Sequence, residues 1–425
     1  MAVSRINPRF GELLTVYSFF TSSASTVKPL RSTLATVNLS ILRQNFRTIA
    51  ERASEALPKG APRPAMMPVV KADAYGHGIV PCAKALLEEG QNLGIDTMLG
   101  VAFAAEAAPL RASEDMPDTR IAVVTPPFAH GAAEYCRLNL EFCAASHTTM
   151  HAFSAEAAKT GRLLNAHLTI DTGMRRDGIQ PHEAVEFMRS VGNLPNITVR
   201  GICTHFATSD EADKTYFHKQ VRIFQETLNA LRDAGFTFRD VHAANSGAVA
   251  ESIVEHDGNA SNNALFTLLR PGIALYGYNP SHELHAPMHL APVMSLTTSI
   301  ISLRRLPAGE AVSYGCRYIT PRETTIATIP IGYADGFRRG LTGKVQVLIA
   351  GKFFPVVGTI CMDQCMVDIG DESFAVGEEV ILLGSSQTSE YRITADDWAS
   401  ALGTISYEIC TGITARVPRV YVGQN

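Results

Sequence analysis

Between about residue 36 and residue 290, short apolar runs rich in β-branched residues alternate with stretches whose apolar residues recur at helical spacing. Eight runs have the length and composition of strands: Met66–Lys71, Thr97–Phe103, Arg120–Thr125, Leu140–Ala145, Leu164–Ile170, Ile197–His205, Asp240–Ala244 and Thr267–Tyr276. Helical stretches, among them Leu39–Ala56, Gly78–Glu89, Met150–Thr160 and Lys214–Ala234, precede or separate them. This alternation predicts an α/β fold built on a (β/α)8 barrel. The alternative is a doubly wound open sheet, which the absence of a Gly-rich dinucleotide-binding loop after the first strand disfavours.

After about Pro292 the pattern becomes mostly strand-like. The predicted strands are Met294–Leu303, Thr324–Pro330, Lys344–Ile349, Phe354–Asp368 and Glu379–Leu383, and only Ala395–Leu402 is predicted to be a helix. The stretch 279–292 contains three prolines and three histidines without a periodic pattern, which is typical of a linker. We therefore expect a barrel domain at 33–285 and a β domain at 286–425.

Residues 1–32 are expected to form an N-terminal extension that is flexible or packed on the β domain. Arg5 and Arg9 precede an apolar patch, Leu13–Phe20, which loosely resembles a secretory signal. A flexible extension and a start codon placed too early fit the same pattern. Since no other stretch approaches the ~18 consecutive apolar residues of a membrane helix, we expect a cytoplasmic protein with no membrane partner, and export is the alternative.

Composition narrows the class of protein. Hydrophobic residues make up 46% of the chain and charged residues 18%, which is typical of a compact globular enzyme. The net charge of -4 argues against nucleic acid as a partner. The eight cysteines show no zinc-binding or disulfide spacing, so we expect free thiols in a reducing compartment and no metal site.

Chemistry is concentrated first in the segment Val69–Gly78, where a lysine ends the first predicted strand. The active sites of such barrels form at the C-terminal ends of the strands, so the Lys71 amine would lie at the mouth. A partly desolvated lysine loses its proton readily and can form a Schiff base. A lone lysine would more often be a surface residue. Here Tyr75, His77 and two glycines follow within one loop, which favours a functional site.

A second segment, Arg270–Gly277, ends the last predicted strand with an arginine. The backbone N–H groups of Gly272 and Ile273 can bind an anion, and Ser246 at the end of the seventh strand can donate to the same group. Barrels often hold phosphate near strands seven and eight. The sequence therefore predicts a phosphate site beside Lys71.

These segments and three others resemble the signatures of alanine racemases, and the resemblance runs from about residue 33 to the C-terminus. The five segments are Val69–Gly78, Arg270–Gly277, Val312–Gly315, Ile331–Gly336 and Gly358–Asp363. The resemblance implies an isomerase that interconverts L-alanine and D-alanine through an aldimine of pyridoxal 5'-phosphate, for supply of D-alanine to peptidoglycan. It further implies that Lys71 binds the cofactor covalently and that Tyr75 contacts its phosphate.

Racemisation needs a proton-handling group on each face of a flat carbanion. The resemblance implies that Lys71 serves one face and Tyr314 the other, with Arg176 as the cation that lowers the pKa of the tyrosine and faces the substrate carboxylate. It also implies that Arg270 bonds the pyridine nitrogen. Because arginine is not deprotonated in proteins, that nitrogen would stay unprotonated, which favours simple proton exchange over transamination.

The resemblance assigns roles to five more residues. His205 packs against the cofactor ring and contacts Arg270. Tyr407 contacts the phosphate and the entrance, Tyr333 lies at the entrance, and Met362 and Asp363 belong to the loop that binds the substrate carboxylate. In the family, the residues matching Tyr314 and Met362 come from the partner subunit, which implies a homodimer with shared active sites.

The chain departs from the family pattern at two positions. Thr169 stands where the family commonly has a lysine modified to a carbamate, so Arg176 must be positioned in another way, by an anion or water. Arg175 stands where glycine is frequent, and a second cation there could alter the acidity of the tyrosine or the substrate range. The insertion Glu255–Ala264, rich in Asn and Gly, is expected to form a surface loop.

Three other functions remain open at the level of sequence. A broad-range racemase acting on serine or basic amino acids differs only in pocket size, which the sequence does not show. A barrel-fold amino-acid decarboxylase would typically place an acidic residue near the pyridine nitrogen, and Arg270 argues against it. A non-catalytic cofactor-handling protein would lack the β domain that carries Tyr314.

Overall fold

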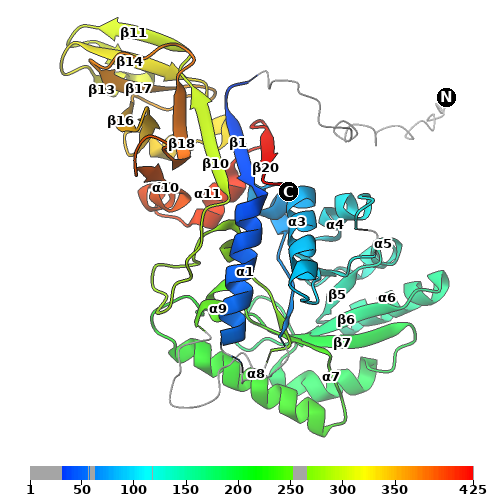
Figure 1. The fold of residues 1–425 in the computed structure, drawn as a ribbon. Helices are drawn as coiled ribbons and strands as arrows, with labels where there is room; N and C mark the ends of the chain where they lie inside the picture. Colours follow the sequence, from blue (N-terminus) through cyan, green and yellow to red (C-terminus); the bar gives the residue numbers. More distant parts are fainter. Residues whose placement is uncertain (1–30, 56, 58–62, 117, 252–265, 425) are drawn as a thin grey trace, which may run out of the picture.

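A computed structural model of the 425-residue chain describes residues 31–55, 57, 63–116, 118–251 and 266–424, arranged as two domains (Figure 1). The expected N-terminal extension up to residue 30 and the expected loop Glu255–Ala264 lie outside the described residues. Within the described residues no helix has the length and apolar character needed to cross a membrane.

Eight parallel strands form the first domain. They are β2 (Ala65–Met66), β3 (Leu99–Val101), β4 (Ile121–Val123), β5 (Glu141–Ala144), β6 (Leu164–Thr169), β7 (Ile197–Cys203), β8 (Asp240–His242) and β9 (Leu268–Leu269). Strands β3 to β8 pair in chain order, and β2 pairs with β9. Met66 bridges to Thr97 on one side, and Thr267 donates to the Val241 carbonyl on the other, so the ring closes. The predicted barrel is confirmed, and the open sheet is wrong.

Helices surround the strands (Figure 1). They are α1 (Leu39–Glu55), α3 (Ile79–Asn92), α4 (Ala104–Arg111), α5 (Ala132–Leu138), α6 (His147–Thr160), α7 (Ala184–Val191), α8 (Thr215–Asp233) and α9 (Ser246–Glu251). Four of them, α1, α3, α6 and α8, correspond to helical stretches predicted from the sequence; in α1, for example, Leu42, Phe46 and Ile49 on the apolar face are fully buried.

The second domain is a ten-stranded sheet with two helices at its end toward the barrel (Figure 1). Its strands are β1 (Leu34–Asn38), β10 (Met294–Ser299), β11 (Ser302–Leu306), β14 (Thr324–Ile329), β15 (Gln346–Ile349), β16 (Lys352–Val357), β17 (Cys365–Gly370), β18 (Glu379–Ser385), β19 (Arg392–Ile393) and β20 (Arg419–Val422). A separate hairpin pairs β12 (Ala311–Val312) with β13 (Tyr318–Ile319), and the helices are α10 (Ala395–Leu402) and α11 (Ser406–Gly412).

Strand β1 joins the β domain although it precedes the barrel in the chain. It lies between β10, to which it is antiparallel, and β20, to which it is parallel. The pairing of β1 with β20 joins a strand near the start of the described chain to the last strand. Residues 34–38, which the sequence grouped with the barrel domain, therefore contribute their backbone hydrogen bonds to the second domain.

Candidate active site

A cavity opens at the C-terminal ends of the barrel strands and brings together nine of the residues singled out from the sequence. These are Lys71, Tyr75, Arg176, His205, Ser246, Arg270, Gly272, Ile273 and Tyr407. They come from the ends of different strands and from α11. Segments more than 300 residues apart in the chain therefore converge on the position where barrel enzymes place their chemistry.

The segment α2 (Lys71–Gly76) that follows the first barrel strand is a left-handed turn. Ala72, Asp73, Ala74 and Tyr75 all have φ between 51° and 55°. For L-residues this conformation costs roughly 1–2 kcal/mol per residue, so the surroundings must hold it in place. The Ala72 N–H donates to the Glu106 carboxylate at 2.7 Å, and the Ile79 N–H donates to Asp73 at 2.8 Å. These bonds fix the loop that carries Lys71 and Tyr75.

Lys71 lies in the cavity with its ammonium partly removed from water. Burial lowers its pKa, and the positive charges of Arg176 and Arg270 lower the pKa further. A lysine whose ammonium is destabilised in this way supplies the neutral amine that Schiff-base formation requires.

A small cradle for an anion lies between Ser246 and the start of the segment after β9. The backbone N–H groups of Gly272 and Ala274 point at the Ser246 hydroxyl, at 3.0 and 3.3 Å. A Cβ added to Gly272 would lie 2.6 Å from the Tyr75 hydroxyl, so only glycine leaves room for this tyrosine. Burial raises the pKa of Tyr75, which therefore stays protonated and can donate a hydrogen bond. The ring of Tyr407 lies 6.0 Å from that of Tyr75.

Arg270 is buried at the end of β9 and donates to several groups, including the Ala243 carbonyl at 3.3 Å. Its guanidinium contacts the Thr204 carbonyl at 2.7 Å, Nδ1 of His242 at 3.1 Å and Nδ1 of His205 at 3.4 Å. Burial and the charge of Arg270 lower the pKa of His205 to about 3, so this histidine is neutral near pH 7. The contact between His205 and Arg270 that the resemblance implied is thus present.

The structure shows the contacts of the two residues at which the chain departs from the family pattern. The Thr169 hydroxyl faces the Cys203 sulfur at 3.5 Å, inside the barrel. Arg175, whose φ of 58° is the conformation glycine favours, turns its guanidinium to Asp171 at 3.3 Å and does not line the cavity. Arg176 does line it, and its described ion-pair partner is Asp177 at 3.6 Å.

The other four predicted residues lie together elsewhere, in what we call the β-domain cluster: Tyr314, Tyr333, Met362 and Asp363. Tyr314 lies between β12 and β13, and Figure 1 shows β13 well away from the barrel. The N–H of Tyr333 donates to the Cys361 carbonyl, and the Thr359 hydroxyl donates to the Tyr314 carbonyl, which joins the three loops. Tyr314, Tyr333 and Met362 are 73%, 40% and 51% exposed. No member of this cluster lines the cavity of its own chain.

Sequence reasoning missed two histidines and one glutamate that support the site. His242 and His167 lie inside the barrel on β8 and β6, and Glu106 on α4 caps the left-handed turn. The two histidines were detectable as polar residues at inward-facing positions of otherwise apolar strands. Glu106 gave no local signal, since its partner Ala72 lies 34 residues away.

Comparisons with known proteins cover both domains. Residues 37–280 match the family model for the alanine racemase N-terminal domain, and residues 293–421 match that for the alanine racemase C-terminal domain. Alanine racemase 1 of Clostridium acetobutylicum is 41% identical over 358 residues, which are 83% of this chain and 88% of that protein.

Solved structures show the same similarity. An alanine racemase of Clostridium difficile 630 is 35% identical with a TM-score of 0.82, over 93% of this chain and 97% of that one. The alanine racemase of Bartonella henselae, solved with covalently bound pyridoxal phosphate, is 29% identical with a TM-score of 0.77, over 93% of this chain and all of that one.

Proposed function

Because the chain belongs to the alanine racemase family and is a pyridoxal-phosphate-dependent isomerase of L- and D-alanine, we propose that two residues from different subunits handle the substrate proton. Lys71 acts on one face of the substrate, and Tyr314 of the partner subunit acts on the other. The observation that carries this proposal is the separation of the residues: the cavity of one chain holds the amine, and its matching phenol is exposed on a distant surface.

The lining of the cavity suits pyridoxal phosphate. Arg176 and Arg270 are cations that favour an anionic cofactor, and Gly272 leaves room for the Tyr75 hydroxyl beside the proposed phosphate site. We propose that Lys71 holds the cofactor covalently, as the bound cofactor of the Bartonella henselae relative suggests. When bound, pyridoxal phosphate draws electrons from the Cα–H bond of the amino acid and makes its proton acidic.

The remaining cavity residues have binding roles in this proposal. The Ser246 hydroxyl and the N–H groups of Gly272 and Ile273 hold the phosphate, and the protonated phenols of Tyr75 and Tyr407 donate to it or close its pocket. These groups lie at one end of the cavity and would fix the orientation of the cofactor.

Arg270 points a permanent cation at the pyridine nitrogen in this proposal, and neutral His205 lies beside it. Because its guanidinium keeps its protons, Arg270 cannot accept one from the ring, and the ring nitrogen cannot gain one from it. We expect this to favour return of the proton to Cα, and so racemisation over transamination. An acidic residue at this position, as in decarboxylases of this fold, would have the opposite effect.

Proton transfer on the second face requires a phenol with a lowered pKa. Tyr75 and Tyr407 are buried, and burial raises the pKa of each, so neither is suited to this role. Tyr314 is exposed, and in a dimer the proposed arrangement would place the guanidinium of Arg176 beside its hydroxyl, where a cation favours the anionic form of a neighbouring group. Arg176 would also bind the substrate carboxylate.

The β-domain cluster supplies the rest of the site across the subunit interface. Exposed Tyr333 and Met362 would cover the entrance, and Met362 and Asp363 would lie near the substrate carboxylate. The Asp363 carboxylate is bound by Arg416 at 2.7 Å within its own chain, which holds that loop in position. A homodimer in which each β domain faces the other barrel follows from this arrangement.

Isotope exchange in the Tyr314→Phe variant tests the two-base assignment. Each base serves one face, so the variant should lose racemisation by at least about a thousandfold while Lys71 still exchanges the Cα proton of one alanine enantiomer in D2O. Proton NMR of the Cα–H signal of L- and D-alanine measures both rates.

Tyr391→Phe is the control, since Tyr391 is an exposed tyrosine of the same domain that packs against Phe353 outside the cluster. It should behave as the unmodified protein. Full racemase activity in Tyr314→Phe, or loss of exchange with both enantiomers while cofactor is bound, would contradict the assignment.

We also infer that the D-alanine produced supplies peptidoglycan synthesis. This role is supported by the alanine racemase family to which the chain belongs.

A further inference from the structure

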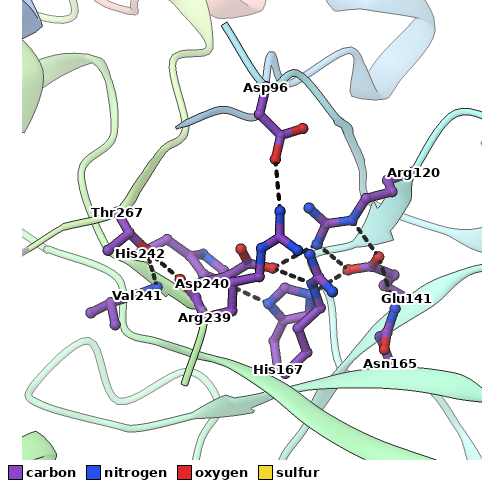
Figure 2. A network of polar contacts seen from close by, with 11 residues as sticks. Asp96, Arg120, Glu141, Asn165, His167, Arg239, Asp240, Val241, His242 and Thr267 are labelled. Carbon is purple, nitrogen blue, oxygen red and sulfur yellow. Dashed lines mark hydrogen bonds and ion pairs between the residues drawn. The ribbon is translucent and has the colours of Figure 1, made fainter. Parts of the chain in front are cut away.

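A line of hydrogen bonds runs through the interior of the barrel, from its N-terminal end to the cavity. Figure 2 shows the part formed by Glu141, His167 and His242. Nε2 of His167 lies 2.8 Å from the Glu141 carboxylate, and its Nδ1 lies 2.9 Å from Nε2 of His242. Nδ1 of His242 lies 3.1 Å from the guanidinium of Arg270. All four side chains are at least nine-tenths buried.

Only one arrangement of protons satisfies these contacts. Arginine can only donate, so Nδ1 of His242 must accept and its Nε2 must carry the proton. Nε2 of His242 then donates to Nδ1 of His167, whose own proton must sit on Nε2 and be donated to Glu141. Burial and the charge of Arg270 lower the pKa of His242 well below its usual value, which keeps it neutral. The direction of every bond is therefore fixed by its two ends, a cation and an anion.

We propose that Glu141 and His167 are positioning residues for the racemase reaction: together with His242 they form a histidine relay (Glu141, His167, His242 and Arg270) that keeps His242 an acceptor and so fixes Arg270 toward the cofactor. The inference rests on the proposed role of Arg270. If His242 adopted its other tautomer, two donors would face each other at 3.1 Å and the guanidinium would have to move. The carboxylate at the far end of the barrel removes that tautomer.

The anionic end of the relay is built to stay ionised. Burial alone would raise the pKa of Glu141, but the bonds from His167 and Arg120 outweigh it and set that pKa to about 2. Arg120 donates to both carboxylate oxygens, at 2.8 and 3.0 Å, and Asn165 adds a third bond at 3.2 Å. Glu141 is therefore a fixed anion near pH 7.

The backbone makes room for the relay. A Cβ added to Gly201 on β7 would lie 2.1 Å from Nδ1 of His167. The imidazole of His167 therefore lies where a side chain at position 201 would begin. Glycine weakens a strand interior, and a close approach by another group is the usual reason for it.

The same end of the barrel offers Glu141, His167 and Asp240 in an arrangement that could hold a metal ion. Two arginines already occupy its carboxylates: Arg120 contacts Asp240 at 2.6 Å, and Arg200 contacts it at 2.9 Å (Figure 2 draws the Arg120 contact). The charges of these two carboxylates are therefore balanced by the two arginines, and of the two carboxylates only Glu141 bonds His167.

Neutron diffraction of deuterated holoenzyme crystals tests the proton arrangement directly. We expect deuterium on Nε2 of both His167 and His242 and none on Nδ1 of either. Deuterium on Nδ1 of His242 would overturn the proposal, whatever the activity of the enzyme.

Substitution tests the consequence for the reaction. In Glu141→Gln the acceptor of the His167 proton loses its charge, and hydrogen bonds to charged groups are stronger than those to neutral groups. The preference of His167 and His242 for the tautomer protonated on Nε2 should therefore decrease. We expect about a tenfold rise in pyridoxamine phosphate formed per racemisation turnover, with a shift of the visible absorption band of the bound cofactor. Asp240→Asn is the matched control, because Asp240 is an equally buried carboxylate on Arg120 that does not contact a histidine. It should leave both readouts within about twofold of the unmodified protein.

A second pair of variants, at His167, tests the relay if the Glu141→Gln protein does not fold. The amide oxygen of His167→Asn can still accept from His242, whereas His167→Leu removes the acceptor, so only the leucine variant should show the full change. Equal changes in Glu141→Gln and Asp240→Asn, or in the two His167 variants, would overturn the relay. Arg270→Lys distinguishes a failure of the relay from a failure of the proposed role of Arg270. If Arg270→Lys leaves the cofactor band and the product ratio unchanged, the proposed role of Arg270 is wrong. If Arg270→Lys changes both and Glu141→Gln changes neither, only the relay is wrong.

Discussion

Single residues decide the shape of the cofactor cradle. Gly272 is the clearest, because the Tyr75 hydroxyl occupies the space where a side chain would begin, 2.6 Å from an added Cβ. The N–H of Gly272 also points at Ser246, so the position combines a steric and a polar requirement. Tyr75 in turn packs on Tyr276, with ring centroids 4.9 Å apart, and cannot retreat freely.

Gly272→Ala should therefore weaken cofactor binding by about tenfold, because Tyr75 must shift and a hydrogen bond to a charged phosphate is lost. The overpacking should also lower the free energy of unfolding by about 1–3 kcal/mol. Fluorescence titration of the apoprotein with pyridoxal phosphate and urea unfolding measure the two effects.

Gly131→Ala is the control for this substitution. Gly131 lies outside the cavity, and the nearest atom to an added Cβ is 3.8 Å away. If both variants bound the cofactor equally well, the steric account of the cradle would be wrong.

The sequence was sufficient to predict residues whose chemistry is local. Residue type and position alone predict a reactive amine at Lys71 and an anion site at Arg270–Ile273. The structure places both in one cavity. The inward-facing His167 could be noticed by residue type, but its hydrogen bond to Glu141 could not be predicted. That role exists only through side-chain hydrogen bonds across the barrel interior, which the strand pattern does not encode.

Among the elements, the left-handed turn at Ala72–Tyr75 departs most from what local propensity predicts. Four consecutive L-residues hold a positive φ, and the Glu106 carboxylate from α4 binds the turn at Ala72. Sequence patterns describe this segment only as a loop after a strand. The strain is tolerated because it presents Lys71 and Tyr75 to the cavity from one short segment.

Ala72→Gly should relieve part of that strain. Ala72 is exposed, and the substitution removes a left-handed cost of roughly 1–2 kcal/mol while adding about 0.5–1 kcal/mol of backbone entropy. We expect a protein whose free energy of unfolding is unchanged or raised by up to about 1 kcal/mol, as measured by urea unfolding.

Ala155→Gly in the middle of α6 is the matched comparison, since Ala155 is also exposed but lies in an ordinary helix. It should lower the free energy of unfolding by about 1 kcal/mol. An equal loss in both variants would show that the turn at Ala72 is not strained.

The barrel strands and the long helices were predictable because each carries its own periodicity. Strand β1 was predicted in neither position nor partner: its five residues pair with β10, far along the chain, and with β20 at the C-terminus. Helix α11, which brings Tyr407 to the cavity, is only seven residues long and was also missed. Short elements gain their stability from tertiary contacts, which periodicity does not encode.

At the scale of the whole molecule, the two residues that we propose as proton-transfer groups lie at separate places in each chain. The barrel mouth holds Lys71, Arg176 and Arg270, and the β-domain cluster exposes Tyr314 and its neighbours on a surface that no described residue of the same chain covers. An exposed apolar set of this kind marks a site of association. We infer that a second copy of the chain brings its Tyr314 to Lys71.

Subunit mixing tests that claim most directly. Lys71→Ala and Tyr314→Phe homodimers should each be inactive, but a hybrid of the two has one site with both Lys71 and Tyr314, so random reassembly should restore about a quarter of the unmodified activity. Restoration to that level after unfolding and refolding the two variants together, and not after refolding either alone, is the predicted result. No restoration, with hybrids shown by mass spectrometry to have formed, would contradict the shared site.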